Sequence, residues 1–334
     1  MSGPRHALVP RIPAVFAVVR ALIARLRRPL VQISGSSCLH PIVAMATAGT
    51  ISAQAVPAPT PAPAPDVYLA SLNVARGAVT VGPPLNITDR VGYDNQPSFS
   101  IDGAGIFFTS VRADAQADIY RYDIATKAIT RVTNTAPESE YSATPIDAGR
   151  AISVIRVERD SAQRLWRVPL DGTAPTVILE RIRPVGYHAW ADSRTLALFV
   201  LGSPNSLQLA DVQRGTADTI ATGIGRSLHR IPSTQRVSFV RKVGPTEWWI
   251  ESLDPKTRAT TRLARLPEGV EDYAWLPDGS ILCGRGSQLL RWSANTGNEW
   301  RAIADLASAG IGGITRLAVS GRGDRIAFVA EGRP

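Results

Sequence analysis

The sequence predicts an all-β protein built as a six-bladed β-propeller of four-stranded antiparallel blades. From residue 67 onward, short apolar β-type runs alternate with turns rich in Gly, Pro, Asp and Asn, without a convincing helical period. A turn of the same kind also recurs at a nearly constant interval along the chain. Recurrence every ~40–50 residues is typical of propeller blades.

The recurring turn follows the first strand of each expected blade. Its copies read SFSIDGAGIFF, ATPIDAGRAIS, AWADSRTLALF, RIPSTQRVSFV, AWLPDGSILCG and VSGRGDRIAFV, with turn positions at Asp102, Asp147, Ser193, Ser233, Asp278 and Arg322. Successive positions are 45, 46, 40, 45 and 44 residues apart, which suits a four-stranded blade. In the three turn aspartates we expect the carboxylate to accept backbone N–H bonds rather than to act in catalysis.

Each copy continues with a third strand, a polar turn and a fourth strand. The third strands are DIYRYD, RLWRVPL, SLQLADV, WWIESLD and QLLRWSA, and fourth strands such as AITRVTN and ATTRLAR follow them. The last copy supplies only two strands, whereas residues 67–89 resemble a third and fourth strand without the first two. Joining both chain ends in one sixth blade leaves no free sheet edge.

Residues 1–55 are typical of a targeting segment. They contain six arginines, no acidic residue and two apolar runs, and Ala53-Gln54-Ala55 fits a small-x-small cleavage pattern. Cleavage after Ala55, a true start further downstream and retention as a membrane anchor remain open. Residues 56–66 alternate Pro and Ala, so they form an extended linker. We therefore expect a targeting segment at 1–55, a linker at 56–66, a propeller at 67–334, and export to the periplasm or the medium.

The net charge of +9 does not indicate a nucleic-acid partner once the charges are located. Removing the six arginines of the first 55 residues from the 37 basic residues leaves 31, against 28 acidic ones. A remaining charge near +3 makes a weak field, so we expect no DNA or RNA binding. Membrane association is expected only through an uncleaved targeting segment, and the propeller is expected to be a monomer.

Motifs of common catalytic and cofactor sites do not occur in the chain. It contains no Gly-x-Ser-x-Gly elbow, phosphate-binding loop, His-Glu-x-x-His or calcium loop, and no cofactor or metal is predicted. Cys283 lies in the apolar run SILCGRG, which favours a buried, unreactive thiol. Trp248 and Trp249 should lie on opposite faces of one strand, with one of them packed against a neighbouring blade.

The first repeat resembles the WD40-like repeat of TolB-type six-bladed propellers. The resemblance is carried by Pro97, Phe99, Ser100, Asp102, Gly103, Ser110, Arg112, Asp118, Ile119 and Tyr120, and in part by Trp275 to Gly279. It extends over residues 67–334 through strand periodicity and is specific for fold rather than activity. It implies a periplasmic accessory role. Such propellers also resemble the non-catalytic domain of prolyl-oligopeptidase-type peptidases.

Candidate binding residues follow from the geometry of a propeller, in which the start of each innermost strand lines one mouth of the central channel. These positions carry Asn95 and Gln96, Glu140 and Tyr141, Tyr187 and His188, Arg226 and Ser227, Glu271 and Asp272, and Thr315 and Arg316; His229 lies close by in the fourth blade. The ring is polar, mixed in charge and partly aromatic. It predicts either a ligand site or a solvated rim.

Two kinds of function therefore remain open. The first is an exported, non-enzymatic propeller that binds a protein or peptide partner, or that works beside a separately encoded peptidase or transporter. The second is a metal-dependent hydrolase, lactonase or lyase centred on the channel, with Glu140, His188, His229, Glu271 and Asp272 as ligands or acid/base groups. Strand-end histidines that serve structure alone are the alternative for His188 and His229.

Overall fold

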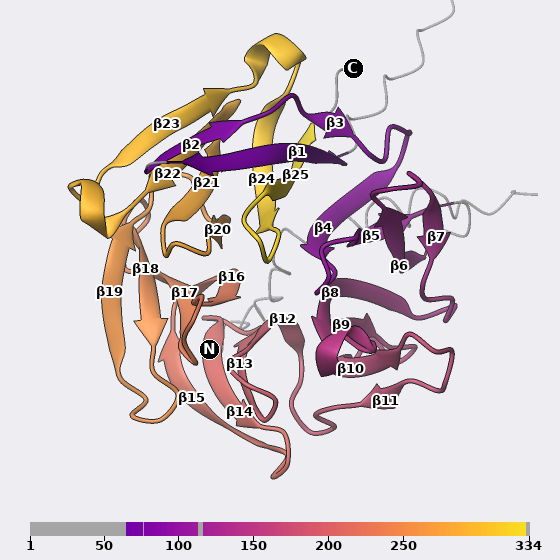
Figure 1. The fold of residues 1–334 in the computed structure, drawn as a ribbon. Helices are drawn as coiled ribbons and strands as arrows, with labels where there is room; N and C mark the ends of the chain where they lie inside the picture. Colours follow the sequence, from indigo (N-terminus) through magenta and orange to yellow (C-terminus); the bar gives the residue numbers. More distant parts are fainter. Residues whose placement is uncertain (1–64, 76, 113–115, 332–334) are drawn as a thin grey trace, which may run out of the picture. The chain divides into compact units, whose positions relative to one another are not determined.

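A computed structural model describes residues 65–75, 77–112 and 116–331, all of which belong to the compact unit Pro61–Pro334. The expected targeting segment and nearly all of the expected linker lie outside the described residues. Within the described part, the chain forms six antiparallel sheets, each with its first strand nearest a common centre (Figure 1). The predicted six-bladed β-propeller is thereby confirmed.

The first three blades are formed in chain order by four strands each. Their strands are β4 (Tyr93–Phe99), β5 (Gly105–Val111), β6 (Ala117–Asp123) and β7 (Ile129–Arg131); β8 (Ser139–Ile146), β9 (Ala151–Val157), β10 (Gln163–Pro169) and β11 (Thr176–Val177); and β12 (Val185–Trp190), β13 (Thr195–Val200), β14 (Ser206–Asp211) and β15 (Thr216–Thr222). The innermost strands of these blades are therefore β4, β8 and β12.

Blades four and five repeat this order. Their strands are β16 (Ile224–Arg230), β17 (Val237–Lys242), β18 (Trp248–Leu253) and β19 (Thr260–Arg265); and β20 (Tyr273–Trp275), β21 (Ile281–Arg285), β22 (Gln288–Trp292) and β23 (Trp300–Asp305). Three short 3-10 turns, Asp147–Gly149, Ala294–Thr296 and Ala307–Ala309, complete the helical content of the described residues.

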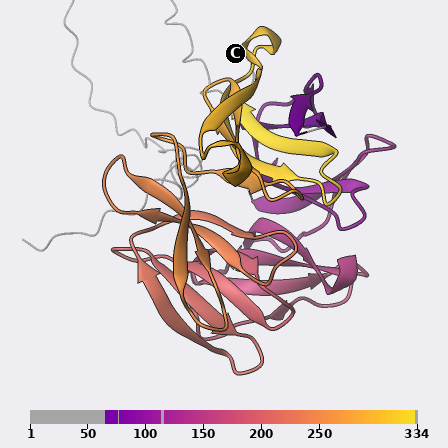
Figure 2. The same cartoon turned by 60° about the vertical axis from the view of Figure 1, so that its left-hand side comes forward.

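The sixth blade joins the two ends of the propeller. It consists of β24 (Gly312–Val319), β25 (Arg325–Glu331), β1 (Pro65–Ala75) and β2 (Ala78–Val81), with β3 (Leu85–Asn86) also paired to β1. β1 runs antiparallel to β25 over seven residue pairs, from Pro65↔Glu331 to Ser71↔Arg325. The N-terminal strands lie beside the C-terminal ones in Figures 1 and 2. The predicted circular closure is confirmed.

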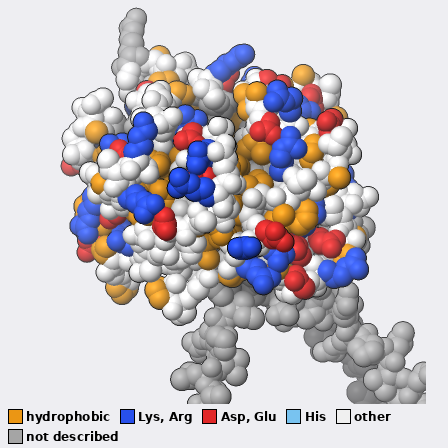
Figure 3. Space-filling model, turned by 90° about the horizontal axis from the view of Figure 1, so that it is seen from below, with side chains coloured by type: hydrophobic (Ala, Val, Ile, Leu, Met, Phe, Trp, Pro, Cys, Tyr) orange, Lys and Arg blue, Asp and Glu red, His pale blue; other side chains and the backbone are white. Residues whose placement is uncertain are grey.

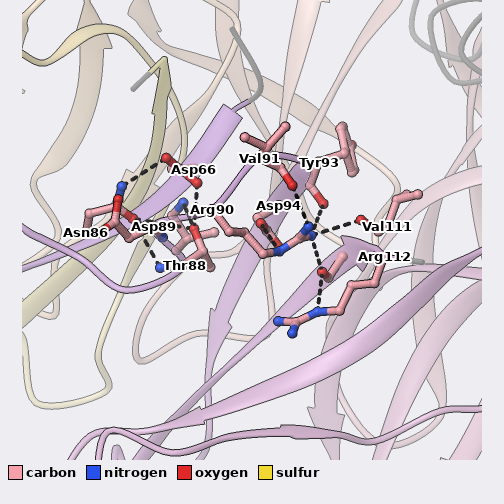
Figure 4. A network of polar contacts seen from close by, with 12 residues as sticks. Asp66, Asn86, Thr88, Asp89, Arg90, Val91, Tyr93, Asp94, Val111 and Arg112 are labelled. Atoms are coloured by element: carbon pink, nitrogen blue, oxygen red, sulfur yellow. Dashed lines mark hydrogen bonds and ion pairs between the residues drawn. The ribbon is translucent and has the colours of Figure 1, made fainter. Parts of the chain in front are cut away.

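Polar contacts secure the connection from the closing strand to the first blade (Figure 4). The buried Asp66 of β1 accepts hydrogen bonds from Asn86 Nδ2 at 2.9 Å and from Thr88 Oγ1 at 3.0 Å. A few residues later, the Arg90 guanidinium pairs with the fully buried Asp94 at 3.0 Å and donates to Ser110 Oγ at 2.8 Å. The Ser110 of the repeat motif thus helps to hold the start of β4.

The core lies between blades, because alternate side chains of each strand point to opposite faces of its sheet. In β5, Phe107 packs with Ile152 of the second blade, whereas Phe108 packs with Ala327 of the sixth blade. Both phenylalanines are almost completely buried. Each blade therefore depends on its two neighbours for the burial of its apolar side chains.

A cation stacked on an aromatic ring recurs at the end of the second strand in three blades. Arg112 lies over Tyr120 at 4.2 Å, Arg156 over Trp166 at 4.3 Å, and the Lys242 ammonium over Trp248 at 4.1 Å. The arginine of the Ser-x-Arg motif therefore has a packing role, and its equivalents preserve that role where the sequence motif is lost.

The predictions for Cys283 and the tryptophan pair can be compared with the structure directly. Cys283 is fully buried, and burial raises the pKa of its thiol, as expected for an unreactive cysteine. Trp248 and Trp249 are successive residues of β18, and both are partly exposed. Trp248 packs in the cluster shared with the fifth blade, whereas Trp249 is covered by Arg262 and donates to Glu247 Oε1 at 2.8 Å.

Candidate functional site

A cavity of about 1010 Å³ follows the central channel, between the innermost strands and the turns that come after them. Its wall is formed largely by small and apolar side chains, including Pro97, Ala143, Ala189, Ala274 and Ala318. Small residues suit this place because six strands converge on the channel. Polar, charged and aromatic side chains lie between these residues along the wall, and such a mixture can both orient and bury a ligand.

Five of the six innermost strands have irregular pairing with the second strand of their blade, and in three of them, β4, β8 and β24, the irregularity is a β-bulge that contains a non-glycine residue with positive φ. The register shifts between Asn95 and Ser98 in β4, between Tyr141 and Thr144 in β8, and between Thr315 and Ala318 in β24. Each bulge includes a non-glycine residue with positive φ: Gln96 at 58°, Ser142 at 56° and Arg316 at 51°. Bulges re-aim side chains, and left-handed backbone outside glycine is concentrated at functional sites.

Two of the bulges are bonded to each other across a blade boundary. Gln96 Oε1 accepts the backbone N–H of Ser142 at 2.9 Å and the hydroxyl of Thr109 at 3.1 Å. Ser98 Oγ donates to the carbonyl of Ala143 at 2.6 Å. These bonds fix the first two blades against each other at the channel wall.

A charged cluster lies at one end of the cavity and is contributed by blades four to six. Arg226 holds Asp272 with two hydrogen bonds, from Nη2 at 2.6 Å and from Nε at 3.1 Å. Glu271 accepts the backbone N–H of Arg226 at 2.6 Å and pairs with Lys242 at 3.2 Å. Burial raises the pKa of Asp272, but Arg316, Arg226 and the hydroxyl of Ser227 outweigh it and lower the value to about 2.

Arg316 crosses the channel from the sixth blade to the third. Its Nη2 donates to the Tyr187 hydroxyl at 2.9 Å, and its guanidinium lies 5.0 Å from the centre of the Tyr187 ring. Blades three and six face each other across the ring (Figure 1). The two side chains therefore span the channel axis. The turns that follow the innermost strands border the cavity toward its other end.

The two histidines line the cavity in neutral form. Burial lowers the pKa of His188 to about 3 and that of His229 to about 4, although the charge of Asp272 acts in the opposite direction on His229. His188 Nε2 lies 2.7 Å from Ser153 Oγ, whereas its buried Nδ1 has no hydrogen-bond partner among the described residues. The rings of His229 and Tyr273 pack edge to face, with their centres 4.7 Å apart.

Two tryptophans that the sequence argument did not place in the candidate ring also line the cavity. Trp190 donates its indole N–H to Ser153 Oγ at 3.0 Å, and Trp275 donates to Ser238 Oγ at 2.8 Å. The two bonds are equivalent, since each serine lies on the second strand of the preceding blade. The repeated Ala-Trp before two of the aligned turns is the sequence signal that could have revealed these residues.

The predicted ring residues divide into those on the cavity wall and those away from it. The wall includes Gln96, Tyr187, His188, Arg226, Ser227, His229, Asp272 and Arg316. Asn95, Glu140, Tyr141, Glu271 and Thr315 are not part of it.

Two residues away from the wall have partners of their own. Glu140 is fully buried, bound to Thr135 and to Arg156 Nε at 2.8 Å. Asn95 Oδ1 accepts the N–H of Gln96 at 2.8 Å.

Two of the three turn aspartates form the predicted bonds. Asp102 accepts the N–H of Ala104 at 2.9 Å, and Asp278 accepts that of Ser280 at 2.9 Å. Asp147 differs, because its own φ is 52° and its carboxylate instead accepts from Arg167 Nε at 2.7 Å. All three carboxylates have local partners.

No group of three or more His, Cys, Asp or Glu side chains placed to hold a metal ion occurs among residues 65–75, 77–112 and 116–331. Within the same ranges, no helix is long and apolar enough to cross a membrane.

Comparison with known proteins gives a fold but no sequence family. No protein-family model matches the chain, and no curated protein matches it. Among solved structures, a putative TolB from Agrobacterium tumefaciens is 14% identical with a TM-score of 0.62, covering 80% of this chain and 98% of that one. The fold is that of the TolB-type six-bladed propellers. The predicted resemblance is thus confirmed at the level of fold.

Other solved structures of similar fold belong to different kinds of protein. A nidogen/laminin complex matches with a TM-score of 0.54 and 12% identity, over 80% of this chain and all of that one. An oligogalacturonate lyase in complex with manganese matches with a TM-score of 0.51 and 17% identity, over 74% and 79% of the two chains. At these identities the likeness establishes architecture alone.

Proposed function

We propose that this chain is an exported, non-enzymatic propeller that binds a peptide segment of a partner protein in its central channel. The observation that carries the proposal is the cavity of about 1010 Å³, whose wall combines apolar and aromatic side chains with charged groups that include Arg226, Asp272 and Arg316. Cavities of this size and composition suit small ligands or a few peptide side chains. The proposed working form is a monomer.

The surface charge is consistent with a partner recognised by shape and by local contacts. Over the face that Figure 3 presents, basic and acidic side chains of the described residues are interspersed, with apolar side chains between them. Such a mixture steers no highly charged polymer. The Arg-rich residues 1–55 lie outside the described part, and they support export to the periplasm or the medium.

A peptide selection followed by affinity measurement tests the proposal. A random peptide library is selected on the immobilised full-length chain, and the best binder is titrated by calorimetry. Ala318→Trp would fill the cavity from the wall of β24, and we expect it to weaken binding at least tenfold. Ala128→Trp, in the exposed turn between β6 and β7, is the control and should leave affinity unchanged. Equal effects of both variants would contradict the proposal.

A channel-centred metal enzyme is the second candidate, favoured by one observation. His188 and His229 both line the cavity with lowered pKa, so both are neutral at pH 7 and could bind a metal ion. Metal analysis of protein purified from cells, together with a lactone and glycan hydrolysis screen, decides between the two. Stoichiometric metal that disappears in His188→Gln and His229→Gln would replace the binding proposal; metal-free, inactive protein would remove the enzyme.

A further inference from the structure

The charges of the cluster at the end of the cavity do not balance among the described residues. The cluster contains three cations, Arg226, Lys242 and Arg316, but only two carboxylates, Glu271 and Asp272. All but one of these side chains are less than a quarter exposed, and Lys242 is 32% exposed. A buried charge is normally paired, because removing it from water is costly. The described cluster therefore has room for one more negative charge.

Arg316 is the cation whose hydrogen-bonding capacity is least used. Arg226 forms two hydrogen bonds to Asp272, whereas Arg316 lies 3.9 Å from that carboxylate and forms one hydrogen bond among the described residues, to Tyr187. A guanidinium carries five N–H donors in a planar fork, which matches the two oxygens of a carboxylate. Most of the donors of this 13% exposed side chain are therefore available to a ligand.

The backbone presents Arg316 to the channel. The bulge in β24 and the positive φ of 51° take this residue out of the regular alternation of the strand. Because an arginine gains nothing intrinsic from left-handed backbone, the conformation indicates that the direction of its side chain matters. Arg316 also belongs to the cavity wall, so a ligand in the cavity can reach it.

Two tyrosine hydroxyls complete a set of donors around Arg316. The Tyr187 oxygen accepts the bond from Arg316, so its own hydrogen remains free to donate. The Tyr93 hydroxyl lies within electrostatic reach of Arg316 and Tyr187 and has no hydrogen-bond partner among the described residues. A tyrosine hydroxyl is protonated at neutral pH, and burial raises the pKa of Tyr93 further, so this hydroxyl is able to donate a hydrogen bond.

We propose that Arg316, with the hydroxyls of Tyr93 and Tyr187, binds a carboxylate on the channel axis. The inference rests on the proposed function, since it names the group by which a peptide partner would be held. The carboxylate belongs to the C-terminus or an acidic side chain of that peptide, or to a small free acid. One carboxylate supplies the missing negative charge and forms charge-assisted hydrogen bonds with the guanidinium.

The test compares small probes with matched peptides on the full-length protein. Acetate and its neutral isostere acetamide are titrated by calorimetry at constant ionic strength, as are tetra-alanine with a free and with an amidated C-terminus. We expect acetate to bind and acetamide not to bind. Arg316→Gln should lower the affinity for acetate at least tenfold, and Tyr93→Phe should lower it about threefold. Arg230→Gln, an exposed arginine on the same cavity wall, should change acetate affinity less than twofold.

The outcomes separate the inference from the proposed function. If tetra-alanine with a free C-terminus binds tenfold tighter than acetate, the ligand group is a peptide terminus. If the two affinities are equal, the ligand is a small acid. Both results support the carboxylate site. The inference would be overturned if acetate bound no better than acetamide, or if Arg316→Gln and Arg230→Gln lowered the affinity for acetate equally. If Arg316→Gln does not fold, the comparison of Tyr93→Phe with Arg230→Gln decides. A selected peptide that binds equally well to Arg316→Gln, together with acetate that binds no better than acetamide, would preserve the proposed function and refute this inference.

Discussion

Tyr187 of the third blade and Arg316 of the sixth are joined by a 2.9 Å hydrogen bond across the channel of the propeller. Neighbouring blades are held by packed side chains, but this bond connects two blades that face each other. It also lies in the charged cluster that ends the cavity. A single contact thus links the integrity of the ring to the candidate site.

Removing the Tyr187 hydroxyl should destabilise the propeller. Tyr187→Phe leaves the largely buried Arg316 guanidinium without its hydrogen bond, so we expect the free energy of unfolding to fall by about 1–3 kcal/mol. Urea denaturation of the purified protein measures this. Tyr122→Phe is the control, because the Tyr122 ring is equally buried while its hydroxyl has no hydrogen-bond partner among the described residues. A control variant as unstable as Tyr187→Phe would show that the cross-channel bond contributes nothing.

Glu140 should prove essential for stability although it is not on the cavity wall. Glu140→Gln leaves the buried Arg156 without its 2.8 Å ion pair, and breaking a buried pair costs about 3–5 kcal/mol. Thermal and urea unfolding test this. The matched variant is Glu138→Gln, whose partner Arg159 is 77% exposed and 3.9 Å away, and it should change stability by less than about 1 kcal/mol. Two equally stable variants would be inconsistent with a structural role for Glu140.

Closure of the ring through the sixth blade gives a third expectation. Asp66→Ala removes the acceptor for Asn86 and Thr88 at the closing strand, and should lower the free energy of unfolding by about 1–3 kcal/mol. Asp218→Ala removes an exposed ion pair with Arg258 and should cost about 1 kcal/mol or less. Denaturant unfolding followed by circular dichroism compares the two. A larger effect of Asp218→Ala would argue against this role of Asp66.

The channel histidines predict a loss of stability on mild acidification. In the unfolded chain a histidine titrates near 6.5, whereas burial lowers the folded pKa of His229 to about 4. Between these values the unfolded chain binds more protons than the folded protein. The contribution of this histidine to the free energy of unfolding is therefore complete above the unfolded pKa. It decreases by about 1.4 kcal/mol for each unit by which the pH is lowered toward the folded pKa.

A substitution isolates the contribution of one histidine. From pH 7 to pH 5 we expect His229→Gln to lose about 2 kcal/mol less stability than the parent protein. Urea unfolding at both pH values provides the measurement. Identical losses in the two proteins would mean that His229 titrates normally in the folded state.

The architecture could be read from the sequence because it depends on repetition. The turn spacing from Asp102 to Arg322 fixed the number of blades, and the unpaired half-blades at the two ends predicted closure. Asp102 and Asp278 behave as turn formers because a short carboxylate beside glycine determines its own bonds locally.

The site could be predicted only in part, because its decisive features are not local. The positive φ of Gln96, Ser142 and Arg316 carries no glycine signal, so the bulges could not be foreseen. Likewise, the bond from Arg316 to Tyr187 joins residues 129 positions apart. Glu140 was placed in the ring by its position in the repeat, yet its side chain is buried against Arg156 away from the cavity wall.

The channel as binding site is tested most directly by tryptophan fluorescence during titration with a selected peptide. Trp190 and Trp275 line the cavity, whereas Trp248 and Trp249 are not part of its wall. We predict that the change in emission on binding is abolished in Trp190→Phe/Trp275→Phe and retained in Trp248→Phe/Trp249→Phe. The reverse pattern would place the partner on the outer strands of the fourth blade and contradict the proposed channel site.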